Sequence, residues 1–158
     1  MTIKEICEKY QIKNYTINGD TVDVNGDVDL SKKRLTKLPL KFGIVTGDFY
    51  CSYNELTSLE GAPEKVGGYF SCYLNNLTSL EGAPKKVRVS FSCSFNKLTS
   101  LEGAPEEVGG YFSCHSNNLT SRAQFARIDA YMFTTDFDDF QIPKDKHGKI
   151  KWIFENDD

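Results

Sequence analysis

The chain has 158 residues, of which 39% are hydrophobic and 26% are charged, and its formal net charge is -3. These values are ordinary for a globular protein, and a mildly acidic chain without a long basic run is poorly suited to binding nucleic-acid phosphates. No apolar run approaches the roughly 18–20 residues that a membrane helix needs, and the first residues lack the apolar block of a signal peptide. We therefore expect a cytoplasmic protein with neither a nucleic-acid nor a membrane partner.

Residues 1–25 are predicted to form an N-terminal cap. Thr2 and Glu5 have the spacing of a capping box, and apolar residues follow on one helical face. This pattern predicts a short helix over residues 2–10. Residues 15–25 alternate in polarity around an Asn-Gly pair, which predicts a β-hairpin.

A repeat of 21 residues occupies residues 26–120. The segment Leu-Thr-Ser-Leu-Glu-Gly-Ala-Pro occurs three times without change, beginning at Leu56, Leu77 and Leu98. A divergent earlier copy keeps the apolar positions. Aligned by this step, the chain shows columns of identical residues, which are Phe49, Phe70, Phe91 and Phe112, then Cys51, Cys72, Cys93 and Cys114, then Asn54, Asn75, Asn96 and Asn117. A fixed period of this length is typical of a solenoid, and we predict about five repeats.

The side chains of one repeat are expected to divide between core and solvent. Phe and Cys lie two residues apart, so both face the interior of a short strand, whereas Tyr69 and Ser71 face solvent. The Asn column is expected to bend the chain out of the strand and to bond to backbone groups of the turn. Gly82 and Pro84 are expected to set the return turn.

The order apolar, x, Cys, x, x, Asn, x, Leu, x, x, Leu resembles the leucine-rich repeat. Gly67 and Gly109 depart from it, because the family has a first Leu at their positions. The 21-residue length is similar to short repeats seen in bacteria and large bacteriophages. The resemblance implies a β-rich solenoid with a parallel sheet, whose outward strand residues form a concave binding face.

Residues 121–158 are predicted to form an α/β C-terminal cap. A Ser-x-x-Gln capping box precedes a helix expected over residues 121–132, and alternating polarity predicts strands over residues 137–142 and 149–154. As an alternative to simple capping, the aromatic residues of this region form a dimer or partner interface. These residues are Phe137, Phe140, Trp152 and Phe154.

The spacing and expected directions of the cysteine, histidine and acidic residues argue against a catalytic or metal-binding site. On a parallel ladder the first and fourth cysteines of the column lie about 14 Å apart, which is too far for one zinc ion. We expect these thiols to be buried apolar fillers, and Cys7 to be the thiol most easily reached. His115 follows Cys114 directly and faces the opposite way, and the acidic cluster at 136–139 lacks calcium-loop spacing. We predict a protein without catalytic activity, metal or cofactor.

The outward residues of the repeats form the predicted partner-binding site. Tyr50, Tyr69 and Tyr73 are expected to be close neighbours, and tyrosine is a common hot-spot residue, although it also favours strands for packing reasons alone. The full set is Asp27, Asp29, Asp48, Tyr50, Tyr69, Tyr73, Tyr111 and His115.

These patterns predict a non-catalytic protein-binding module that uses the concave face of its repeats. If the similarity to bacteriophage proteins extends to function, the partner is a host protein that is inhibited in the host cytoplasm. The alternative is a structural or self-assembling protein that dimerises through the aromatic C-terminal region.

Overall fold

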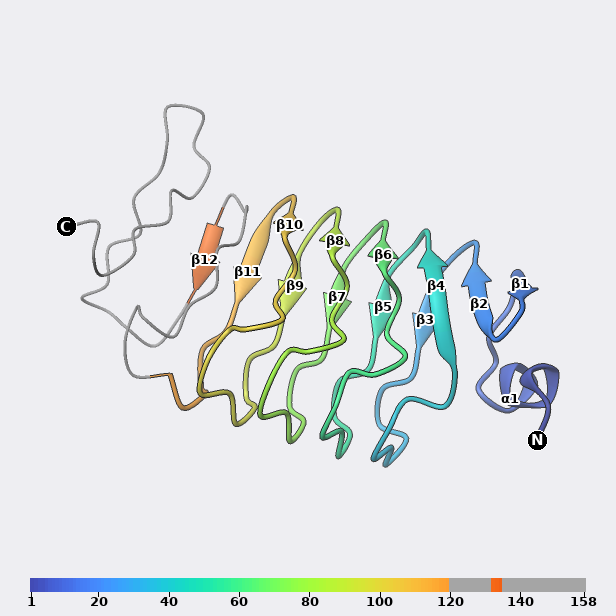
Figure 1. The fold of residues 1–158 in the computed structure, drawn as a ribbon, viewed down its shortest axis with the longest axis horizontal. Helices are drawn as coiled ribbons and strands as arrows, with labels where there is room; N and C mark the ends of the chain where they lie inside the picture. The colour runs from blue at the N-terminus through green and yellow to red at the C-terminus, as the bar shows by residue number, and fades with distance from the viewer. Residues whose placement is uncertain (120–131, 135–158) are drawn as a thin grey trace.

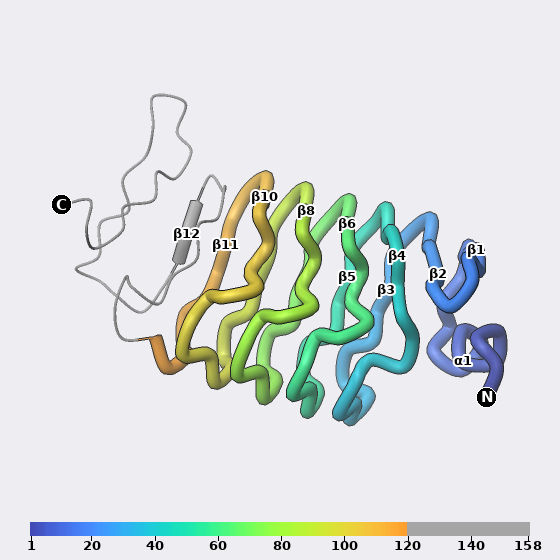
Figure 2. The backbone as a smooth tube through the Cα atoms, in the orientation of Figure 1, coloured from blue at the N-terminus to red at the C-terminus, as the bar shows by residue number. Residues whose placement is uncertain are grey.

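The fold is a β-solenoid of about four turns with one short helix, seen in a computed structural model that describes residues 1–119 and 132–134 (Figure 1). Successive coils of the chain stack side by side, as the tube in Figure 2 shows. Each coil contributes one strand to each of two sheets, which we call sheet A and sheet B. No helix in the described part of the chain is long and apolar enough to cross a membrane.

Sheet A and sheet B contain six strands each. In sheet A these are β1 (Tyr15–Asn18), β2 (Thr21–Val24), β4 (Lys41–Val45), β6 (Lys65–Val66), β8 (Lys86–Val87) and β10 (Glu107–Val108). In sheet B they are β3 (Val28–Asp29), β5 (Phe49–Tyr50), β7 (Phe70–Ser71), β9 (Phe91–Ser92), β11 (Tyr111–Ser113) and β12 (Met132–Thr134). All neighbours are parallel except β1 and β2, which form an antiparallel hairpin.

The interior is filled by columns of identical side chains, as the alternation predicted. The rings of Phe49, Phe70, Phe91 and Phe112 stack with centroids 5.4, 5.2 and 5.1 Å apart. The four cysteines beside them and the two leucines of each of the three identical return segments are at most 1% exposed. Each turn therefore buries its apolar face only against its neighbours, which is the packing logic of a solenoid.

The asparagine column ties neighbouring turns together through their backbones. The Asn75 side-chain oxygen accepts a hydrogen bond from the Leu56 N–H at 3.0 Å, and its Nδ2 donates to the Cys51 and Cys72 carbonyls at 3.0 and 3.1 Å. Asn96 and Asn117 repeat this arrangement one and two turns further on. The predicted bonds to the turn are confirmed, and each asparagine also bonds to the preceding turn.

The N-terminal helix and hairpin form where the sequence predicted them. Helix α1 (Ile3–Lys9) begins at Thr2 with both halves of the capping box in place. It ends in a left-handed residue, Gln11, with φ of 57°. Cys7 was expected to be the most accessible thiol, and this was wrong, because it is 0% exposed beneath the helix.

Two predictions about the fold need correction, and one feature was not predicted. About five repeats were expected, but the equivalent strands from Val28 to Phe112 enclose only about four complete turns. The predictions did not include sheet A on the return side, where Val66 and its equivalents are buried while the neighbouring lysines stay exposed. Met132 was placed at the end of a helix, yet it lies in β12, beside β11.

The remaining C-terminal predictions lie outside the described residues. They are the helix over residues 121–131, the strands over 137–142 and 149–154, and the interface residues Phe137, Phe140, Trp152 and Phe154.

Candidate functional site

A continuous row of aromatic side chains runs across the turns where the chain leaves sheet B. We call Tyr53, Tyr73, Phe95 and His115 the aromatic row. Their ring centroids are 5.6 Å apart for Tyr53 and Tyr73, 5.1 Å for Tyr73 and Phe95, and 5.4 Å for Phe95 and His115. At one end, the Lys32 Nζ lies 5.3 Å from the Tyr53 ring centroid, which is close enough for a cation–π interaction.

Two residues of the aromatic row, Tyr53 and Phe95, and Leu74 in the turn between them have a backbone conformation that bulky residues do not favour. Tyr53, Leu74 and Phe95 occupy equivalent positions with φ of 55°, 57° and 57°. Glycine or asparagine normally fills such left-handed positions, since a bulky L-residue is strained there. The three side chains are also 48%, 41% and 42% exposed, so burial offers little compensation for the strain. The same conformation recurs one turn to either side, at Lys32 and Ser116 with φ of 57° and 56°, so it belongs to the geometry of the turn. What distinguishes Tyr53, Leu74 and Phe95 is that these positions carry exposed apolar side chains.

A shallow groove beside the aromatic row is lined by three other tyrosines. Tyr50, Tyr69 and Tyr111 surround a volume of about 260 Å³, whose floor is formed by serines and the edges of Phe70 and Phe91. Tyr69 is 48% and Tyr111 54% exposed. Sheet B therefore presents aromatic surface both along its strands and at their exits.

The predicted tyrosine trio is divided between these two features. Tyr50 and Tyr69 line the groove together, whereas Tyr73 contacts Tyr53 and Phe95 in the aromatic row. His115 does face outward as predicted, and its ring packs edge-on against Phe95. Tyr73 is not among the residues that line the groove, and the chain turns at the left-handed residue that follows it.

The acidic residues of the predicted site have structural hydrogen bonds. The Asp27 carboxylate accepts a hydrogen bond from the Asp48 N–H, and the Asp48 carboxylate accepts one from the Tyr69 N–H, both at 2.8 Å. Asp29 accepts from the Ser31 N–H at 2.9 Å. These carboxylates therefore link one turn to the next or brace a local bend.

Tyr50 is the residue of this face whose ionisation is most affected. Its hydroxyl donates to the second Asp48 carboxylate oxygen at 3.2 Å. Partial burial, followed by the nearby Asp48 charge and this hydrogen bond, raises the pKa of Tyr50 above its ordinary value. The phenol stays neutral near neutral pH, so it serves this face as a hydrogen-bond donor.

Tyr53, Leu74 and Phe95 were not included in the predicted site. A signal for them exists in the sequence, because each is a large apolar or aromatic residue that directly precedes the column asparagine of its own repeat. What the sequence does not reveal is their left-handed backbone, which turns these side chains out of the core.

The described residues offer little for catalysis or metal binding. Within residues 1–119, no three His, Cys, Asp or Glu side chains converge as a metal site would require. The cysteines are buried, and burial raises the pKa of the Cys51, Cys72 and Cys93 thiols, which makes them weak nucleophiles. Two further grooves, of about 510 and 620 Å³, lie beside α1 and across sheet A.

Comparisons with models of known protein families, with curated proteins and with solved structures found no match.

Proposed function

We propose that this protein acts by binding another protein through the aromatic row and the adjoining tyrosine groove of sheet B, without catalysing a reaction. The observation that carries the proposal is the set of exposed Tyr53, Leu74 and Phe95 side chains held in a left-handed conformation. Exposed apolar clusters of this kind are typical of interaction sites, and aromatic residues dominate interface hot spots.

We also propose that the turns are short leucine-rich-type repeats. Two features support this assignment: the buried leucine pair of each return segment and the asparagine that bonds to two successive turns. The partner class that we expect is a folded protein or an extended segment rich in apolar side chains. We propose further that this chain is encoded by a bacteriophage and that the partner is a host protein that it inhibits.

The proposal is tested by recovering partners from a bacterial lysate with the immobilised protein and by measuring their affinity in purified form. A triple variant, Tyr53→Ser, Tyr73→Ser and Phe95→Ser, should lower the affinity at least about thirtyfold, since one hot spot contributes about 2 kcal/mol. A matched triple variant on sheet A, Ile44→Ser, Lys65→Ser and Lys86→Ser, should bind like the unmodified protein. Recovery of no specific partner, or equal binding by both variants, would contradict the proposal.

A further inference from the structure

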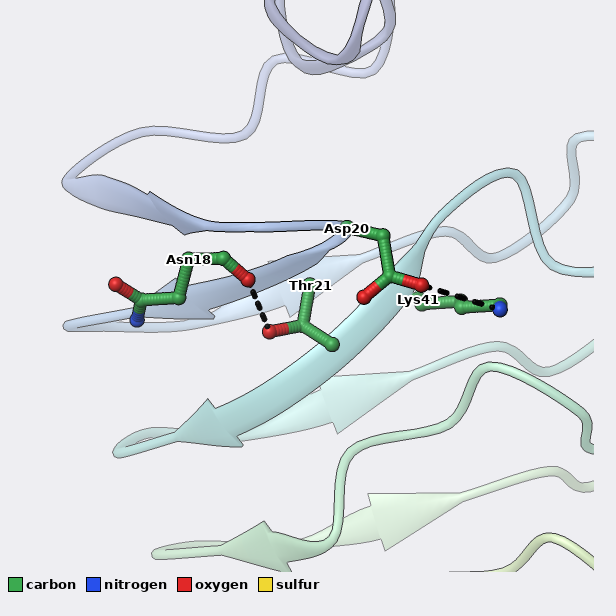
Figure 3. A network of polar contacts seen from close by, with 4 residues as sticks. All are labelled: Asn18, Asp20, Thr21 and Lys41. Atoms are coloured by element: carbon green, nitrogen blue, oxygen red, sulfur yellow. Dashed lines mark hydrogen bonds and ion pairs between the residues drawn. The ribbon is translucent and has the colours of Figure 1, made fainter.

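Strand β1 forms the open N-terminal edge of sheet A. It pairs with β2 on one side, and no described strand lies on the other (Figure 1). The turn between the two strands is fixed, as Figure 3 shows: the Thr21 hydroxyl donates to the Asn18 carbonyl at 3.0 Å, and Lys41 forms an ion pair with Asp20 at 3.3 Å. These two contacts hold the hairpin turn, and with it the open edge of β1, in a fixed position.

The outward hydrogen-bonding groups of β1 belong to Tyr15 and Ile17. In an antiparallel pair, bonded and non-bonded residue pairs alternate along the ladder. The Asn25 N–H donates to the Asn14 carbonyl at 2.9 Å, so the pair 14 and 25 is a bonded one. Counting from it, Thr16 bonds to β2, whereas Tyr15 and Ile17 direct their N–H and C=O groups away from β2.

The side chains of β1 leave one apolar residue uncovered. Ile17 lies opposite Val22, which is 0% exposed, and so belongs to the core-facing side of the sheet. Ile17 itself is 44% exposed, because the sheet ends there. The strand also contains no charged residue and no proline, which are the usual protections of an exposed edge.

We propose that β1 pairs antiparallel with β1 of a second copy of this chain, about a two-fold axis at Thr16, so that two A sheets join into one. In this register Tyr15 of each copy lies opposite Ile17 of the other, which satisfies the outward backbone groups and covers Ile17. Aromatic pairs with β-branched residues and Thr pairs are favourable across strands. In the same register the exposed Lys13 lies opposite Gly19 of the second copy, one residue from Asp20, so no like charges face each other at the ends of the pairing.

Disulfide trapping tests the register directly. The Thr16 residues of the two copies would lie opposite each other in a non-bonded pair. Their Cα atoms would be about 4.5 Å apart, which is within disulfide range. A Thr16→Cys variant should therefore form a covalent dimer under mild oxidation. The five native thiols are at most 1% exposed, so they should contribute no background.

The matched control is Asn18→Cys, because Asn18 lies in the same strand and is exposed, as Thr16 is. Its two copies would lie about 14 Å apart, beyond disulfide reach. A Thr16→Cys variant that stays monomeric, or one that cross-links no better than Asn18→Cys, would overturn the proposal.

Sedimentation of the full chain supplies a second, independent measurement. The unmodified protein should shift from monomer to dimer as its concentration rises. Ile17→Lys places a charge on the edge and should raise the dimer dissociation constant at least about tenfold. Ile44→Lys, at an isoleucine that is 46% exposed elsewhere in sheet A, should change it less than about twofold. A concentration-independent monomer, or equal effects of the two variants, would reject the pairing without bearing on sheet B.

Discussion

At the scale of single residues, left-handed backbone positions occur both after α1 and where the chain leaves sheet B. Gln11 after α1 and the exit residues of sheet B share almost the same φ. At Gln11 the conformation has a local purpose, because the Gln11 N–H donates to the Glu8 carbonyl at 3.2 Å and the Ile12 N–H donates to the Cys7 carbonyl at 2.8 Å. These two bonds form the Schellman motif that ends the helix. The Gln11 side chain is exposed, so other residue types can take its place.

Gln11→Gly should therefore stabilise the protein. Glycine removes the strain of the left-handed conformation, about 1–2 kcal/mol. Its greater freedom in the unfolded state offsets only part of this, so we expect the free energy of unfolding to rise by about 0.5–1 kcal/mol. Chemical unfolding followed by circular dichroism measures the change. Lys9→Gly, two residues earlier and inside the helix, is the control and should lose about 1 kcal/mol. A loss at both positions would show that the helix end is not limited by strain.

Asn75→Ala should cost about 2–4 kcal/mol. The side chain is 6% exposed, and its removal leaves the Leu56 N–H and two cysteine carbonyls without this partner in a buried environment. Asn76→Ala is the matched control, because within the described residues no side-chain hydrogen bond is seen for Asn76, and it should stay within about 0.5 kcal/mol. Urea unfolding of the two variants in parallel distinguishes them, and similar midpoints would contradict a structural role for the asparagine column.

At the scale of elements, the sequence predicted sheet B better than sheet A. The Phe and Cys columns alternate over several residues, so their inward direction and the outward direction of Tyr69 could be read directly. The strands of both sheets have two residues in most turns, but in sheet B the alternation continues past the strand to the buried cysteine, whereas Lys65–Val66 in sheet A has a single buried position and therefore no readable period. Of the aromatic row, Tyr73 and His115 were predicted, whereas Tyr53 and Phe95 were not, because residue type does not reveal their left-handed backbone.

The cysteine column predicts how stability depends on alkaline pH. An unfolded thiol ionises near pH 8.5, whereas burial raises the pKa of Cys51, Cys72 and Cys93 in the folded protein. Above about pH 8.5 unfolding therefore releases protons, and the free energy of unfolding falls as the pH rises, by up to about 1.4 kcal/mol per pH unit for each thiol. Below that pH this contribution is fully present.

Urea unfolding between about pH 8 and pH 10 measures this slope. Cys72→Ala should reduce the slope by the share of one thiol, whatever its effect on stability at neutral pH. Tyrosine ionisation affects both proteins alike and cancels in the difference. An unchanged slope in Cys72→Ala would mean that this thiol ionises in the folded protein.

At the scale of the whole molecule, the strict 21-residue step makes the turns interchangeable. Phe49, Phe70, Phe91 and Phe112 pair in sequence, so each turn offers its neighbour almost the same surface. In such an array, stability is approximately a sum over turns and the interfaces between them. The number of turns is then free to change, provided that the register is kept.

Removing residues 70–90, which is one full step, should leave a folded protein with a lower melting temperature. Tyr69 would then join Phe91, and Phe49 would stack on Phe91 as it does on Phe70. The control removes residues 71–90, one residue fewer, and turns Phe91 outward because strand side chains alternate with a period of two. We expect cooperative thermal unfolding, followed by circular dichroism, only for the first deletion. Cooperative unfolding of both would show that the register tolerates slippage.

The backbone support of the aromatic row predicts the heat-capacity change that binding of the proposed partner would produce. Its exit residues sit on a backbone that hydrogen-bonds to the next turn, as the Tyr53 N–H does to the Tyr73 carbonyl at 2.9 Å. A partner that covers the row therefore orders almost no backbone of this protein. We expect a negative heat-capacity change that matches the apolar area covered, without the larger change and entropy loss of a segment that folds on binding.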